Sequence, residues 1–199
     1  MMRRGFAALL GAVLLVTSGC AMADRAGAAA IVDGNRYSAQ ELANDFRELD
    51  AALGTEQKPG TMDEVNRAII GIVVADMIMD KVSTAENLDV DMAAVATLRD
   101  NLTKQLGGEQ QLLAFAASRG VPPRLLDTVL KQSVFQTELG AKLIGGTDTD
   151  AQGEAALKYL QDFSKNMNIE VSPRFGTWDP SQLVAVPPID DLSKPALTQ

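Results

Sequence analysis

The thiol of Cys20 is the most reactive side chain that the sequence offers, and it belongs to the only cysteine in 199 residues. A free thiol can attack an electrophile, bind a metal or be modified covalently. Cys20 directly follows the uncharged apolar stretch 5–16 and the short segment 17–19, and Arg3 and Arg4 precede that stretch. A positive start, an apolar run and small residues are typical of a secretory signal. The run is too short for a transmembrane helix, which needs about 20 apolar residues.

The segment around Cys20 resembles a bacterial lipoprotein signal, in which a peptidase cuts before a cysteine whose thiol has been diacylated. This resemblance implies that residues 1–19 are removed and that Cys20, carrying a lipid such as palmitate, becomes the mature N-terminus. The protein would then be held at the extracytoplasmic face of the cell membrane. Thr17 departs from the motif, which most often has leucine there. The alternative is a chance cysteine in an ordinary signal peptide.

The charge balance excludes one class of partner. Loss of Arg3 and Arg4 with the signal would take the net charge from −8 to −10. An acidic surface of this kind repels nucleic acid and anionic lipid headgroups. We therefore expect no nucleic acid partner, and we expect the N-terminal lipid to provide the attachment to the membrane.

Residues that could catalyse a reaction are scarce. The chain has no histidine, which removes the commonest general base and the commonest zinc ligand. It contains neither a phosphate-binding glycine loop nor a nucleophile elbow. The carboxylate pairs Asp89/Asp91 and Asp148/Asp150 are best interpreted as helix caps. The sequence thus predicts a non-enzyme without catalytic residues, metal site or cofactor.

Methionine and aromatic residues are the candidates for a binding surface. Methionine side chains are flexible and polarisable, so a cluster of them can form an adaptable apolar surface. The alternative is that they fill the core. The candidates for contacting a peptide are Met77, Met79, Met92, Phe115, Phe135 and Trp178, and Met62 and Met167 belong to the same group.

The elements that must position these residues are mainly helical. Ser38 with Glu41 and Thr61 with Glu64 have the spacing of capping boxes, which begin helices. Apolar residues at helical spacing after each box and farther along predict six helices. Their expected ranges are 38–53, 61–81, 91–106, 109–119, 123–144 and 151–167, with the second the most apolar and therefore buried.

Two short strands frame the helices. One is expected over 31–37, with a turn at Asp33-Gly34, and the other over 168–173. Neither is stable alone, so we expect them to pair and join the two ends of the domain. The expected organisation is a signal (1–19), a tether (20–29), a mainly α domain (30–176) with a two-stranded β-element, and a disordered Pro-rich, acidic tail (177–199).

The order of these elements is similar to the N-terminal peptide-binding domain of SurA-like and PrsA-like extracytoplasmic foldases. Three segments carry the resemblance: AAIVDGNRYSAQELANDF (29–46), AENLDVDMAAVATL (85–98) and IEVSPRFGTWD (169–179). Members of that family often carry a parvulin prolyl-isomerase domain before the closing helix and strand, where this chain has only GGTDTDAQG (145–153).

The resemblance implies a helical cradle that binds unfolded or extended secreted polypeptides without catalysis. The alternative is an envelope adaptor that holds one dedicated folded protein.

Overall fold

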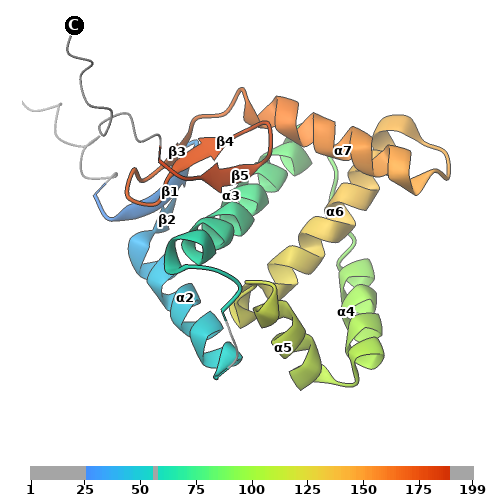
Figure 1. Cartoon of the computed structure of the whole chain (residues 1–199). Helices are drawn as coiled ribbons and strands as arrows, with labels where there is room; N and C mark the ends of the chain where they lie inside the picture. The colour runs from blue at the N-terminus through green and yellow to red at the C-terminus, as the bar shows by residue number, and fades with distance from the viewer. Residues whose placement is uncertain (1–25, 56–57, 189–199) are drawn as a thin grey trace, which may run out of the picture.

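The computed structural model describes residues 26–55 and 58–188, in which the chain forms six α-helices, one 3-10 turn and five short strands (Figure 1). The prediction of a mainly α fold is confirmed. The predicted signal, Cys20 and most of the tether lie outside the described residues. The elements are β1 (Ala28–Val32), β2 (Asn35–Ser38), α2 (Ala39–Leu53), α3 (Met62–Glu86), α4 (Met92–Leu106), α5 (Glu109–Ser118), η1 (Pro123–Leu125), α6 (Leu126–Ile144), α7 (Thr149–Ser164), β3 (Ile169–Val171), β4 (Thr177–Asp179) and β5 (Val184–Val186).

Helix α3 is the central element, as its apolar sequence predicts. Its 25 residues span about 37 Å, and it contacts β1, β5, α2, α6 and α7. The predicted capping box is present, because the Glu64 N–H donates to Thr61 Oγ1 and the Thr61 N–H donates to Glu64 Oε2. The helix extends past the predicted end at Lys81. Val82 is fully buried in the core, and packing of this residue stabilises the last turns.

The other helix starts also follow local signals. The Ser38–Glu41 box begins α2. Asp91 accepts hydrogen bonds from the backbone of α4, and Asp148 does the same for α7, which confirms the cap interpretation for one member of each pair. Asp89 lies before the cap of α4, and Asp150 lies in the first turn of α7. Because Asp148 is the cap, α7 begins at Thr149 rather than at residue 151. The fifth predicted helix starts with the 3-10 turn η1 and continues as α6.

Two helix pairs organise the second half of the helical region. Helices α4 and α5 pack with the start of α6 around a small apolar cluster of their own. Helices α6 and α7 make the most extensive contact, and they approach closely at Gly140. A Cβ atom at this position would lie 2.3 Å from the Gln152 carbonyl oxygen, so only glycine allows the two backbones to come so near.

Strand β1 joins the two ends of the helical region. It pairs antiparallel with β2 through the Asp33-Gly34 turn, whose residues both have positive φ, and antiparallel with β3 with Val32 opposite Ile169. The predicted pairing of the N-terminal and C-terminal strands is confirmed. The element has three strands in the order β2-β1-β3 rather than two, because the Asp-Gly turn makes a complete hairpin.

Strands lie beyond both ends of the expected range 30–176. β1 begins at Ala28, and Ala28 and Ala29 are buried. Strands β4 and β5 form a hairpin inside the segment predicted to be disordered. This hairpin forms because β5 packs on α3 and Ala185 is buried there, a tertiary contact that outweighs the polar local sequence.

Candidate functional site

A groove on the surface of α3 is the best candidate for a binding site. It has a volume of about 490 Å³ and lies between α3, the middle of α6 and the β4–β5 hairpin. We call it the hairpin groove. Its lining residues are Glu64, Arg67, Ala68, Gly71, Ile72, Ala75, Gln132, Leu183, Val184 and Ala185.

Small residues make the floor of the hairpin groove. Ala68, Gly71 and Ala75 repeat at helical spacing on one face of α3. A Cβ atom on Gly71 would meet no atom within 4 Å, so open space begins at the helix backbone. The groove therefore exists because this face lacks side chains large enough to fill it.

Gln132 links α6, which forms one wall of the groove, to α3, which forms its floor. This residue of α6 is 9% exposed, and its Nε2 donates a hydrogen bond of 2.8 Å to the Ile72 carbonyl of α3. A buried amide with a satisfied hydrogen bond fixes the spacing of two helices. The width of the groove is thus set by a specific contact rather than by loose packing.

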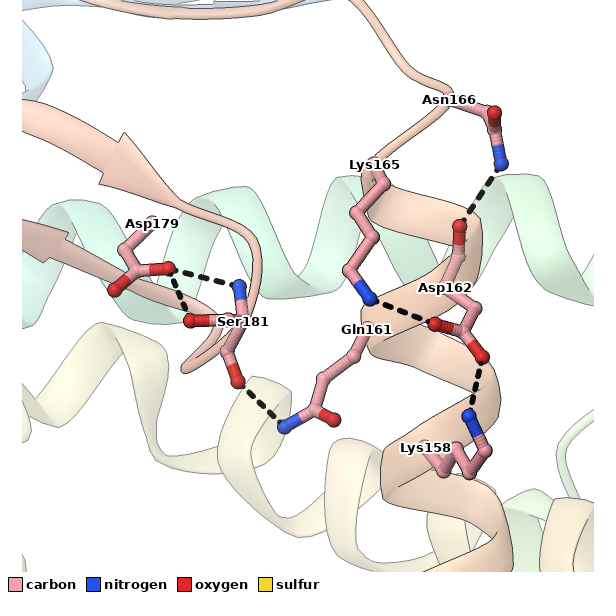
Figure 2. Close-up of polar contacts among 7 residues, drawn as sticks. All are labelled: Lys158, Gln161, Asp162, Lys165, Asn166, Asp179 and Ser181. Atoms are coloured by element: carbon pink, nitrogen blue, oxygen red, sulfur yellow. Dashed lines mark hydrogen bonds and ion pairs between the residues drawn. The ribbon is translucent and has the colours of Figure 1, made fainter.

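The opposite wall is the hairpin, which is fastened to α7. Gln161 Nε2 donates to the Ser181 carbonyl at 2.7 Å, and Asp179 Oδ1 accepts from both the N–H and the hydroxyl of Ser181 (Figure 2). Trp178 Nε1 donates to the buried Ser164 hydroxyl at 2.9 Å. These contacts hold β5 beside α3.

Close packing also fixes where the hairpin begins. Gly176 has φ of +141°, and a Cβ atom there would lie 2.0 Å from the Val186 carbonyl oxygen. Strand β5 pairs only with β4 among the described strands, so it is an edge strand. Its residues Val184 and Ala185 line the groove, which places an edge strand next to an apolar hollow.

The charges of the groove are gathered at its ends. At one end are Arg67 and Glu64, whose pKa is lowered by the hydrogen bonds from Thr61. Next to the other end, Lys131 Nζ lies 3.2 Å from Asp76 Oδ1 and 2.9 Å from Asp80 Oδ1. Burial raises the pKa of the Asp76 carboxyl, and the nearby Lys131 partly offsets this. The middle of the groove remains apolar.

Two other polar clusters have structural roles. On α7, Asp162 lies between Lys158 and Lys165, whose hydrogen bonds lower the pKa of its carboxyl to about 2 (Figure 2). All three side chains are exposed. Such surface ion pairs contribute little to stability.

The second cluster surrounds a fully buried carboxylate, Asp45 of α2. It accepts hydrogen bonds from Tyr37 Oη at 2.5 Å and from Arg124 Nε and Nη2 at 2.7 and 2.6 Å. Burial raises the pKa of the Tyr37 hydroxyl, and the hydrogen bond to Asp45 adds to this effect. The cluster joins β2, α2 and η1, and none of its residues lines the hairpin groove.

The six residues singled out from the sequence do not form one surface. Phe135 is 1% exposed and Met79 is 4% exposed, so both are core residues, and Met77 packs against the same core. Met92 and Phe115 are exposed on α4 and α5. Trp178 is a half-buried residue of β4 in the hairpin. None of them lines the hairpin groove.

Sequence reasoning missed the groove because its floor is built from residues without distinctive chemistry. The available signal was the repeat of Ala68, Gly71 and Ala75 on one face of an otherwise apolar helix. The hairpin wall was missed because it falls in the segment predicted to be disordered. Cys20 lies outside the described residues, so its predicted lipidation stays a prediction.

Comparison of the chain with protein-family models, with curated proteins and with solved structures finds no match. Within the described residues, no helix combines the length and hydrophobicity needed to cross a bilayer. The same residues contain no group of three or more acidic, cysteine or histidine side chains arranged to hold a metal ion.

Proposed function

We propose that this protein is a lipid-anchored, extracytoplasmic, chaperone-like protein that binds extended segments of secreted polypeptides in the hairpin groove. It acts by binding alone and catalyses no reaction. The observation that carries the proposal is the apolar groove of about 490 Å³ beside the edge strand β5.

The geometry suits an extended chain rather than a compact ligand. An extended peptide can add its backbone to an edge strand while alternate side chains enter neighbouring pockets. Here β5 supplies the edge, and the floor of Ala68, Gly71 and Ala75 leaves room for side chains of different sizes. A groove with few polar groups selects for apolar content rather than for a specific sequence, as a chaperone requires.

The resemblance to the SurA-like and PrsA-like foldases supports binding without catalysis. Only residues 145–148 separate α6 from α7, where members of that family often carry the prolyl-isomerase domain. Affinity for unfolded clients is expected to be modest, about micromolar or about 8 kcal/mol, because ordering a client costs entropy.

The test is suppression of aggregation of a denatured, reduced reporter protein, followed by light scattering. Gly71→Leu fills the groove floor, and Gly153→Leu is the matched control, because a Cβ atom at either glycine meets open space. Both changes improve helix propensity, so both variants should fold. We expect Gly71→Leu to lose most of the suppression and Gly153→Leu to retain it.

Two results would contradict the proposal. Equal suppression of aggregation by the two variants would show that the hairpin groove does not bind the clients. Acceleration of prolyl isomerisation by the protein would show that it is an enzyme. If the wild-type protein fails to suppress aggregation, and one stoichiometric protein co-purifies with it from the envelope, the adaptor function replaces the chaperone function.

A further inference from the structure

A second apolar hollow lies on the opposite side of α3. It has a volume of about 310 Å³ and lies between α2, the start of α3 and the turn at 173–175. We call it the α2 groove. Its lining residues are Ala39, Leu42, Ala43, Phe46, Arg47, Met62, Asn66, Arg174 and Phe175.

The charge of the α2 groove is opposite to that of the whole molecule. The chain has 26 acidic and 18 basic side chains, yet the groove is lined by two arginines and no carboxylate. Arg47 donates hydrogen bonds to the Ala43 carbonyl and to Asn44 Oδ1. The Arg174 guanidinium lies 4.6 Å from the centre of the Phe175 ring. Within residues 26–55 and 58–188, neither arginine makes an ion pair.

The apolar part of the α2 groove is accessible. Met62 is 61% exposed at its edge. Phe46 is half-buried, and the Lys58 ammonium lies 5.2 Å from the centre of its ring. Exposed apolar side chains beside two arginines that pair with no described carboxylate match a surface that presents anionic groups above hydrocarbon.

The start of the described chain lies beside the same groove. The Ala39 N–H donates to the Gly27 carbonyl at 2.8 Å, and Arg36 Nη2 donates to the Ala26 carbonyl at 2.8 Å. Ala39 itself lines the groove. Gly27 is seven positions after Cys20, and seven residue steps reach at most about 25 Å when extended. A lipid on Cys20 therefore keeps the α2 groove close to the bilayer.

We propose that the α2 groove docks on the anionic headgroups of the membrane that holds the lipid. Arg47 and Arg174 bind lipid phosphates, and Met62 inserts between the headgroups. The proposal rests on the lipid anchor in the proposed function. It revises the expectation from net charge, because the two arginines give this face a local charge opposite to that of the molecule.

Docking of this kind leaves the hairpin groove free. Met62 and Asn66 of the α2 groove lie on the face of α3 opposite to Ala68, Gly71 and Ala75, as the helical repeat of 3.6 residues requires. A protein that rests on the membrane through the first face presents the second away from it. An acidic peptide could bind the same arginines. The lipid on Cys20, however, holds the groove beside the headgroups at a high effective concentration, and a free peptide has no such attachment.

The test measures how close each face lies to the lipid. The mature lipoprotein is reconstituted into phosphatidylcholine vesicles with or without about 30 mol % phosphatidylglycerol. One fluorescent label is placed on Ala43→Cys in the α2 groove, and in a matched variant on Ala96→Cys, an exposed alanine of α4. The lipid occupies Cys20, so the introduced thiol is the only free one. Quenching by nitroxide-headgroup lipids reports proximity.

In anionic vesicles we expect the label at position 43 to be quenched about threefold more strongly than the label at position 96. In neutral vesicles we expect this difference between the two positions to be smaller. Arg47→Gln with Arg174→Gln should remove most of this difference. Lys104→Gln with Arg119→Gln, which removes one exposed cation from α4 and one from the residue after α5, should leave the difference unchanged.

The outcomes separate the docking from the anchor. If the protein floats with the vesicles but the two positions are quenched equally, or anionic lipid has no effect on quenching, the docking proposal is wrong and the anchor is retained. Failure of the protein to float with the vesicles contradicts the anchor, and the docking with it. If a leucine-rich acidic peptide changes the emission at position 43 and anionic vesicles do not, the groove belongs to a protein ligand and the proposal is wrong.

Discussion

Arg124 and Asp45 form the most consequential single contact among the charged residues described. The Asp45 side chain is fully buried, whereas the Arg124 side chain is 51% exposed. The two members of the pair therefore differ in what their loss leaves behind. Without Asp45 the arginine can turn to water, whereas without Arg124 a carboxylate remains in the core with only the Tyr37 hydroxyl as a partner.

We expect Arg124→Ala to lower the free energy of unfolding by about 3–5 kcal/mol. Lys158→Ala is the matched control, since it removes a cation from an exposed ion pair with Asp162, and it should cost less than about 1 kcal/mol. Urea denaturation at pH 7 measures both. Similar losses for the two variants would show that the buried contact has no special weight.

At the level of the elements, the sequence predicts helices well where the signals are local. Both capping boxes and both aspartate caps could be identified from residue types at fixed spacing. The β4–β5 hairpin could not, because its strands have three residues each and are stabilised by packing on α3. The groove was hidden for a similar reason. A hollow depends on what neighbouring elements leave unfilled, and residue types alone do not give this.

The capping boxes give the helices a dependence on pH. Hydrogen bonds within the boxes lower the pKa of Glu41 and of Glu64. Groups with a lowered pKa stabilise the fold above their unfolded pKa of about 4.3, and this contribution is lost as the pH falls through the folded pKa.

We therefore expect Glu41→Gln with Glu64→Gln to reduce thermal stability at pH 7 and to approach the wild type below about pH 4. Glu154→Gln, at an exposed position in the interior of α7, should match the wild type at pH 7. Thermal denaturation followed by circular dichroism tests this. A constant difference in melting temperature between the wild type and the double variant from pH 7 to pH 3 would mean that the two capping glutamates do not cause the pH dependence of stability.

Truncation separates the two C-terminal β-elements. Sequence reasoning predicts that removal of residues 180–199 is tolerated and that removal of 168–199 destabilises the whole domain. The structure changes the first expectation, because residues 180–199 include β5, which packs on α3 and buries Ala185.

We expect the chain ending at 179 to melt at a lower temperature than the full chain and to lose binding of unfolded clients. The chain ending at 167 should be less stable still, since β1 also loses β3. Calorimetry of the three chains measures this order. An unchanged melting temperature for the chain ending at 179 would show that the hairpin is not part of the folded unit.

At the scale of the whole molecule, the proposed membrane attachment rests on one residue, Cys20. Replacement of Cys20 by serine should leave the signal uncleaved or release the protein from the membrane, because serine has no thiol to carry the lipid. Fractionation of cells and the mass of the mature protein measure this. An unchanged mass and unchanged membrane association of Cys20→Ser would show that another feature anchors the protein.

The place of β1 has a mechanical consequence for a protein held by one end. Under the proposed lipid anchor and client binding, pulling a client away from the membrane would load the domain through the segment before Ala28, which leads directly into β1. β1 lies between β2 and β3 and is antiparallel to both. Such a load shears two hydrogen-bonded ladders at once instead of opening one bond after another. With the proposed anchor, the order β2-β1-β3 would make the point of attachment more resistant to force than a single pairing.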